Sequence, residues 1–127
     1  MPSLVTRGVR VSVESQYSPA RSNPKRGLWF FVYNVKIENL GTSTVQLLSR
    51  HWRITDAHGK LEEVRGPGVV GQQPTLAAGE AFEYSSGCPL RTPFGSMQGS
   101  YEMSLEDGET FQVAIPPFAL RDVRNMQ

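Results

Sequence analysis

The sequence contains a single cysteine, Cys88, so no intramolecular disulfide can form. It has no surplus of charge of either sign, because 13 lysines and arginines balance 12 aspartates and glutamates. This balance of charge does not indicate binding to nucleic acid or to an anionic membrane. No apolar run approaches the length of about 20 residues that spans a bilayer. We therefore expect a reduced, cytoplasmic protein with no nucleic-acid or membrane partner.

Two further patterns are missing. No stretch of helical length repeats apolar residues at helical spacing, and the N-terminus lacks the charged and then apolar layout of a signal peptide. At 127 residues, of which 39% are hydrophobic, the chain is long enough to bury a core. We expect one domain over residues 1–127 with a core over about 9–120, a short flexible N-terminus and a fraying C-terminal tail over residues 121–127.

Apolar and polar residues instead alternate, as they do in half-buried strands. Leu28–Asn39 is the longest such segment. Within Val45–Asp56, Val45 and Leu47 have the opposite parity to Trp52 and Ile54, which indicates either two-sided burial or a bulge near Leu48. The pattern predicts about seven strands, over residues 9–17, 28–39, 45–56, 60–65, 81–85, 101–105 and 111–115.

Short strands separated by turn residues are typical of an all-β fold. We predict a two-sheet antiparallel β-sandwich of the fibronectin type III or immunoglobulin kind. Residues 87–98 are rich in proline and glycine and are expected to form a long connection. Pro116 and Pro117 are expected to end the last strand, after which Phe118 and Leu120 pack back on the core.

One motif stands out, because Gly66, Gly68 and Gly71 form the pattern G-x-G-x-x-G. In a dinucleotide-binding fold this pattern opens a helix whose N-terminus meets the pyrophosphate. Here Pro74 follows three residues after Gly71, and a proline inside a helix costs about 3 kcal/mol. No G-K-[ST] follows either, so a Walker loop is excluded. The motif does not predict a dinucleotide-binding fold.

Two interpretations of this segment stay open. Glycine N–H groups can form an anion-binding nest, and Arg65 lies beside them. Alternatively, the glycines only permit left-handed or closely packed backbone. In both cases the segment is the candidate loop for an anion or a partner. Its candidate residues are Arg65, Gly66, Gly68, Val69, Val70 and Gly71.

Groups that could carry chemistry are scattered. His51 and His58 lie seven residues apart in no metal-binding motif, and Ser49 belongs to no nucleophile elbow. Glu62 and Glu63 are neighbours on a strand and point to opposite faces. We therefore expect no catalytic residues, no metal ligands and no cofactor.

Several blocks identify a family. The segments at residues 45–56, 66–74, 79–87, 95–101 and 115–118 closely resemble the ApaG family. The resemblance implies a fibronectin type III-like sandwich and an association with cobalt resistance and magnesium efflux. It also implies relatives in eukaryotic F-box and polymerase-associated proteins, where the domain is an interaction module. It supplies no catalytic residues.

These observations lead to a first hypothesis, a non-enzymatic binding module that presents loops and a sheet face to a protein partner. The alternative is a weak receptor for phosphate, a nucleotide or pyrophosphate through the loop from Gly66 to Gly71. A divalent-cation handler is a third hypothesis, suggested by the resemblance alone.

Overall fold

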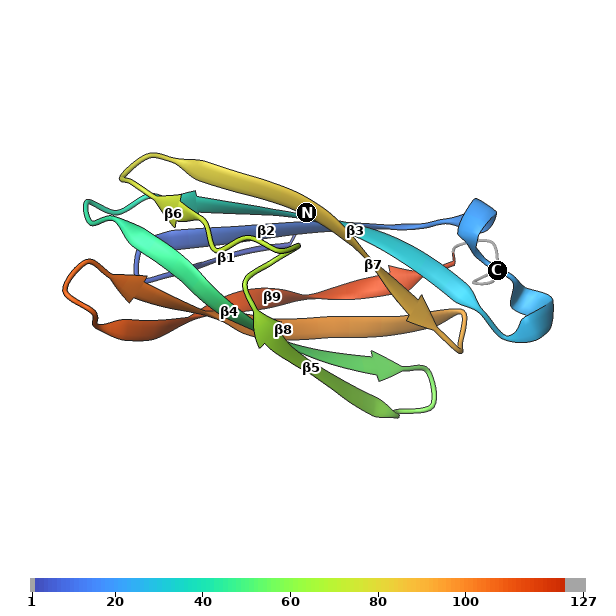
Figure 1. Ribbon diagram of the computed structural model, residues 1–127. Helices are drawn as coiled ribbons and strands as arrows, with labels where there is room; N and C mark the ends of the chain where they lie inside the picture. Colours follow the sequence, from blue (N-terminus) through green and yellow to red (C-terminus); the bar gives the residue numbers. More distant parts are fainter. Residues whose placement is uncertain (1, 123–127) are drawn as a thin grey trace.

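The computed structural model describes residues 2–122 as two antiparallel sheets that pack face to face (Figure 1). The first sheet contains, in order, β1 (Ser3–Thr6), β2 (Val9–Tyr17), β3 (Trp29–Asn39) and β7 (Ala81–Leu90). The second contains, in order, β5 (Leu61–Pro67), β4 (Val45–Asp56), β8 (Phe94–Leu105) and β9 (Thr110–Arg121), with β6 (Thr75–Leu76) also paired to β4. Two 3-10 turns, η1 (Pro19–Arg21) and η2 (Pro24–Arg26), join β2 to β3. The predicted sandwich is confirmed, with nine strands rather than seven.

The core forms because alternate side chains of every long strand point between the sheets. It runs from Val9 in β2 to Leu120 in β9. Trp52 lies at its centre, with its ring 5.4 Å from that of Tyr33 and 5.9 Å from that of Phe118. Phe118 and Leu120 are buried, as predicted.

A bulge in β4 resolves the parity conflict in the sequence. The register with β8 pairs Leu47 with Met103 and Ser49 with Glu102, so Leu48 is an extra residue. Val45 and Leu47 before the bulge and Trp52 after it are all buried. Of the two alternatives that the sequence left open, two-sided burial or a bulge near Leu48, the structure shows the bulge.

A second bulge explains an error. Residues 116–117 were expected to end the last strand, but β9 continues to Arg121. The register runs from Met97 opposite Phe118 to Gly99 opposite Ile115, so the two prolines stand where β8 has one residue. Proline lacks the N–H that a ladder requires and is tolerated at such a bulge.

Three other expectations need correction. The N-terminal segment, expected to be flexible, forms β1 and pairs with β2. Residues 87–98 are mostly strand, because β7 extends to Leu90 and β8 begins at Phe94. In the tail, Arg121 belongs to β9, whereas residues 123–127 lie outside the described part of the chain.

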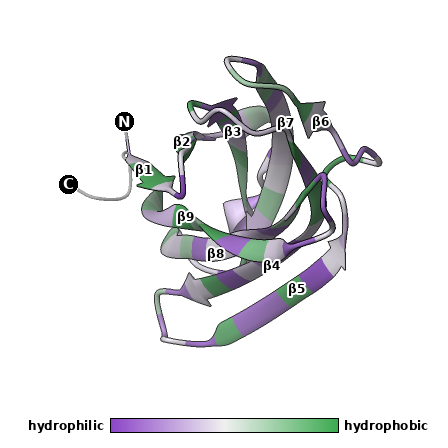
Figure 2. Cartoon of the chain, turned by 90° about the vertical axis from the view of Figure 1, so that its left-hand side faces the viewer, coloured by the Kyte–Doolittle hydropathy of each residue, from purple (hydrophilic) through white to green (hydrophobic). Residues whose placement is uncertain are grey.

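The two sides of the sandwich differ. On one side β9 packs against β1 and β2. On the other, β5 and β7 end their sheets, and residues 61–65 of β5 are exposed on both faces. Figure 2 shows β5 standing apart from the first sheet, with hydrophilic and hydrophobic residues mixed along it. Within residues 2–122, no helix is long and apolar enough to cross a membrane.

Gly99 provides a test of the packing between β4 and β8. A Cβ atom on Gly99 would lie 2.0 Å from the backbone oxygen of His51. We expect Gly99→Ala to lower the free energy of unfolding by about 3 kcal/mol, because the strands must separate. Urea denaturation measures this loss. Ser100→Ala is the matched control, since the Ser100 hydroxyl bonds only to the exposed side chain of Gln112, and it should change stability by less than about 0.5 kcal/mol. Equal stability of the two variants would contradict the close approach.

Candidate functional site

The glycine-rich loop leaves β5 and returns as β6, and both strands pair with the same side of β4, so the loop lies along that side beside the bulge. The backbone N–H of Gly68 donates to the Leu48 oxygen at 2.8 Å, and the Gln73 side-chain amide donates to the same oxygen at 2.8 Å. The N–H of Leu47 donates to Pro74 at 3.0 Å. These bonds hold the loop against β4.

The tip of the loop is a tight turn. Val69 and Gln72 exchange backbone hydrogen bonds of 2.8 and 2.9 Å around Val70 and Gly71. Both central residues have positive φ, 42° at Val70 and 80° at Gly71, as in a type I′ turn. A β-branched residue in this region is strained. Gly68 is needed for a different reason, because a Cβ there would lie 2.3 Å from the Gln72 oxygen.

The two valines of the loop have opposite environments. Val69 is 0% exposed and belongs to the core, whereas Val70 is 53% exposed. Val69 was expected among the contact residues, but burial removes it from any contact surface in this conformation. It instead anchors the loop between the sheets, and Val70 remains at the surface.

The loop's hydrogen bonds bear on the anion-nest interpretation. A nest needs consecutive N–H groups that point at a ligand. The N–H groups of Gly68, Val69 and Gln72 all donate within the protein. The carbonyl oxygens of Pro67 and Gly68 accept from the Arg50 guanidinium at 2.9 and 3.0 Å. Much of the loop's polar backbone is thus already engaged, which argues against a nest.

Arg50 and Arg65 lie on opposite faces of the β4–β5 pair. Arg50 pairs with Gly66 and shares the inward parity of Trp52. A Cβ on Gly66 would lie 3.0 Å from an Arg50 nitrogen, so this glycine makes room for the guanidinium. Arg65 lies on the outer face, 3.4 Å from Glu63, whose carboxylate also contacts His51 Nε2 at 2.8 Å. These two neighbours, the His51 hydrogen bond foremost, lower the pKa of Glu63.

A cleft opens on the side where β5 and β7 end their sheets. Its outer part has a volume of about 500 Å³ and its inner part about 200 Å³, and both are lined by Ile54, Glu62 and Pro89. We call the two together the inter-sheet cleft. The outer part is also lined by Arg26, Gly27, Leu28, Asp56, Lys60, Leu90 and Arg91. The inner part is also lined by Tyr33, Arg50, Trp52, Val64, Ser86, Gly87, Cys88 and Met97.

Four buried tyrosine and cysteine side chains lie in the core, and two of them, Tyr33 and Cys88, line the inner cleft. Tyr84 and Tyr101 share a short hydrogen bond between their hydroxyls, and burial raises the pKa of both. Burial also raises the pKa of Tyr33, an effect offset in part by a hydrogen bond with Ser86 and the charge of Arg50. Burial, and then the charge of Glu62, raises the pKa of the Cys88 thiol to about 12. These groups are protonated at neutral pH and pack as polar members of the core.

The cleft was not predicted, although one signal was present. In the sequence, Arg50 precedes Trp52 by two residues. Once the bulge at Leu48 is accepted, Arg50 must share the inward face with Trp52 and Ile54. The facing residues of β7 could not be found in this way, because they were expected in a loop. As for the histidines, no group of three His, Cys, Asp or Glu side chains that could hold a metal lies within residues 2–122.

The fold and this open side define an antiparallel β-sandwich with a cleft between two free strand edges. Comparison with known proteins gives the family. Residues 19–105 match the model of the ApaG domain. The chain is 55% identical over 120 residues to Protein ApaG of Rhodospirillum centenum, covering 94% of this chain and 92% of that one. It is 52% identical over 120 residues to Protein ApaG of Beijerinckia indica, with the same coverage. The chain belongs to the ApaG family.

Solved structures agree. A Bordetella pertussis protein with 48% sequence identity superimposes with a TM-score of 0.87 and covers 94% of each chain. The C-terminal domain of wzt has 10% identity and a TM-score of 0.54 over 94% of this chain and 75% of that one, and shares the fold alone.

The two valines of the loop allow a paired stability test. We expect Val69→Ala to lower the free energy of unfolding by about 1–3 kcal/mol, because it removes buried methyl groups. Val70→Asn should raise it by about 1 kcal/mol, because asparagine tolerates the left-handed region and Asn-Gly suits this turn. Thermal unfolding of the two variants measures both effects. A loss of stability in Val70→Asn would contradict the turn geometry.

The Cys88 thiol gives a chemical test of the inner cleft. At pH 8 we expect native Cys88 to react with a disulfide reagent at least about 100-fold more slowly than a cysteine placed at Val64 in a Cys88→Ser background, because burial suppresses the thiolate. Folding raises the pKa of this thiol from 9.0 to about 12. Its contribution to the free energy of unfolding is therefore present below pH 9 and is lost as the pH rises from 9 to about 12. Equal reaction rates would show that burial does not suppress the Cys88 thiolate.

Proposed function

We propose that this ApaG-family protein is a non-enzymatic binding module that holds an extended segment of a protein partner in the inter-sheet cleft. One observation carries the proposal. Within residues 2–122, β5 pairs with β4 alone, along one edge, and its residues 61–65 are exposed on both faces beside the cleft.

The backbone of an edge strand is a template for another strand. β5 and β7 both end their sheets, so each has one row of unpaired backbone groups facing outward. An extended segment can use such an edge for main-chain hydrogen bonds and place alternate side chains in pockets. The inner cleft offers such a pocket, because Trp52 and Val64 form part of its wall.

The chemistry of the cleft favours binding over catalysis. Its thiol and tyrosine hydroxyls are held protonated by burial, whereas a nucleophile needs a lowered pKa or an adjacent base. His51, whose neighbours Arg50 and Trp52 line the inner cleft, bonds Glu63 on the outer face of the sheet. The cleft thus supplies shape, apolar area and cationic groups.

We further propose that the association with cobalt resistance and magnesium efflux is indirect and runs through the partner. Arg26, Arg50, Lys60 and Arg91 line the cleft and repel a divalent cation. The phosphate alternative at the glycine loop has weaker support, because the N–H groups of Gly68, Val69 and Gln72 are already bonded. Arg65 and Val70 are exposed, and they remain the candidate residues of the loop that can contact a partner.

Site-specific photo-crosslinking tests the proposal. A photoreactive residue in place of Val64 should capture one partner in cells, because this side chain lies at the cleft and is 36% exposed. Mass spectrometry then identifies the partner and the segment joined to it. The same residue in place of Ser12, on the outer face of β2, is the matched control. Capture of the same proteins from both positions, or a partner segment that is a folded helix, would count against the cleft.

A further inference from the structure

The charges of this nearly neutral chain are separated along the sandwich. Three connections meet at the end that carries η1 and η2, over residues 18–28, 57–60 and 91–93. They contain five cations and no carboxylate, namely Arg21, Lys25, Arg26, Lys60 and Arg91. The connections at the opposite end contain four carboxylates, namely Glu80, Glu106, Asp107 and Glu109. The outer part of the cleft opens at the basic end.

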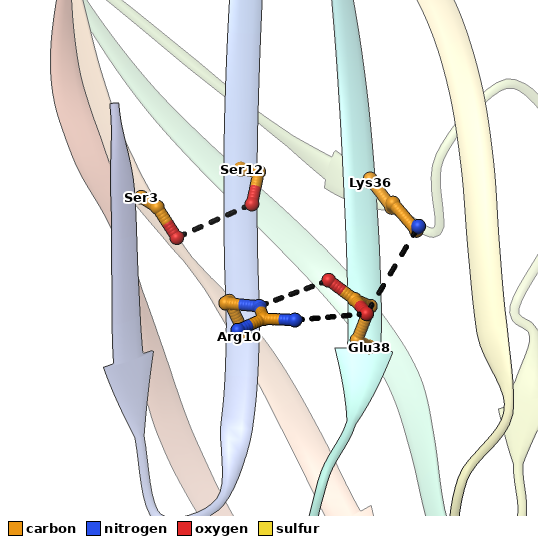
Figure 3. Close-up of polar contacts among 5 residues, drawn as sticks. All are labelled: Ser3, Arg10, Ser12, Lys36 and Glu38. Carbon is orange, nitrogen blue, oxygen red and sulfur yellow. Dashed lines mark hydrogen bonds and ion pairs between the residues drawn. The ribbon is translucent and has the colours of Figure 1, made fainter. Parts of the chain in front are cut away.

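Four cations elsewhere on the protein, Arg7, Arg10, Lys36 and Arg65, have carboxylate partners. On the outer face of the first sheet, Arg10 donates to both Glu38 oxygens at 2.9 and 3.1 Å, and Lys36 lies 4.0 Å from the same carboxylate (Figure 3). At the acidic end, Arg7 pairs with Glu109 at 3.0 Å.

The cations of the cleft differ. Within residues 2–122, none of Arg26, Arg50, Lys60 and Arg91 lies within ion-pair distance of a carboxylate. The cleft has two carboxylates against these four cations, and one of them, Asp56, accepts the backbone N–H groups of His58 and Lys60 at 2.9 Å each. Asp122, which follows β9 at this end, is buried and already has a partner. The cleft therefore has unneutralised positive charge.

Arg50 supplies the inner part of this charge. Only Nη1 is used, in the two bonds to Pro67 and Gly68. Nε and Nη2 donate to no other group in the described part of the chain, although the side chain lines the inner cleft. A guanidinium with spare donors in a half-buried position suits a carboxylate, which it can bind through two parallel hydrogen bonds.

The spacing of the cations sets the length of a segment that could contact both ends of the cleft. Arg50 pairs with Gly66, and Lys60 precedes β5 with the same parity as Gly66. These two positions are six residues apart along the chain, a distance of about 20 Å in an extended strand. Between them, the wall offers Trp52, Ile54 and Val64 to apolar side chains. An extended segment would thus meet a cation at each end and, between them, a largely apolar wall in which Glu62 is the one charged group.

We propose that the cleft recognises an extended acidic segment with two carboxylate side chains six positions apart, one on Arg50 and one at the basic end. This inference rests on the proposed function and names the chemistry of the partner. A nucleic acid fits less well, because a polyanion needs a continuous basic track and Glu62 lies in the middle of this one.

Synthetic peptides test the inference. The probe is a blocked heptapeptide with glutamate at both ends, valine at the third and fifth positions, and serine between. Two matched peptides replace the glutamates by glutamine or by lysine. Amide chemical shifts at residues 60–66 and 86–88 report the cleft. We expect the acidic peptide to bind at about millimolar affinity, the glutamine peptide about tenfold more weakly, and the lysine peptide not at all.

Protein variants locate the two contacts. Lys60→Gln with Arg91→Gln changes only exposed side chains and should weaken the acidic peptide about threefold to tenfold. Arg50→Gln should weaken it by about tenfold, and Arg50→Lys, which keeps the charge, should weaken it less. Arg53→Gln is the control, because Arg53 lies on β4 with the opposite parity. Unfolding midpoints are measured for each variant, and a loss of binding is accepted only where the midpoint is unchanged.

The outcomes separate the inference from the proposed function. Equal cleft shifts with the acidic and glutamine peptides would overturn the acidic inference and leave the binding module in place. Shifts from none of the peptides would overturn both. Inorganic pyrophosphate that displaces the acidic peptide and binds as tightly alone would overturn the extended segment in favour of a small anion.

Discussion

The extra residue at Leu48 is the constraint on which the candidate site depends. Before the bulge, Val45 and Leu47 face the core, and after it Arg50, Trp52 and Ile54 do. Because side chains alternate strictly along a regular strand, a β4 without the bulge would turn Arg50 outward whenever Leu47 was buried. The inward guanidinium of the cleft is thus a consequence of one inserted residue.

The same residue organises the glycine loop. The Leu48 carbonyl accepts from Gly68 and from the side chain of Gln73, so the loop is seated where the bulge interrupts the ladder. Val69 then fills the space between the sheets on that half of the open side. Along β5, no residue has this role, and the cleft remains. The loop and the cleft therefore lie along the same side of the second sheet, where β5 and β6 pair with β4.

This arrangement changes the meaning of the G-x-G-x-x-G pattern. Each glycine has a structural reason: Gly66 lies under the Arg50 guanidinium, Gly68 approaches the Gln72 oxygen, and Gly71 takes a positive φ in the turn. None of these reasons involves a phosphate. The strained residue of the loop is Val70, which is not a glycine. Its side chain is exposed and its φ is positive, so another residue would meet the structural needs of this position better.

The sequence by itself determined most strands and their buried faces, and it reduced the parity conflict within residues 45–56 to two alternatives, one of which was the bulge near Leu48. These features depend on the alternation of side chains and on backbone preferences within a few residues, so they can be predicted from short segments of sequence. The sequence was misleading at Pro116 and Pro117, which suggested that the last strand ends there. The bulge that accommodates these prolines forms only where β9 pairs with β8. Tertiary structure alone decided which edges stay free, that β7 faces β5 across a cleft, and that cations from three connections meet at one end. These outcomes follow from pairings between distant residues, which no local pattern encodes.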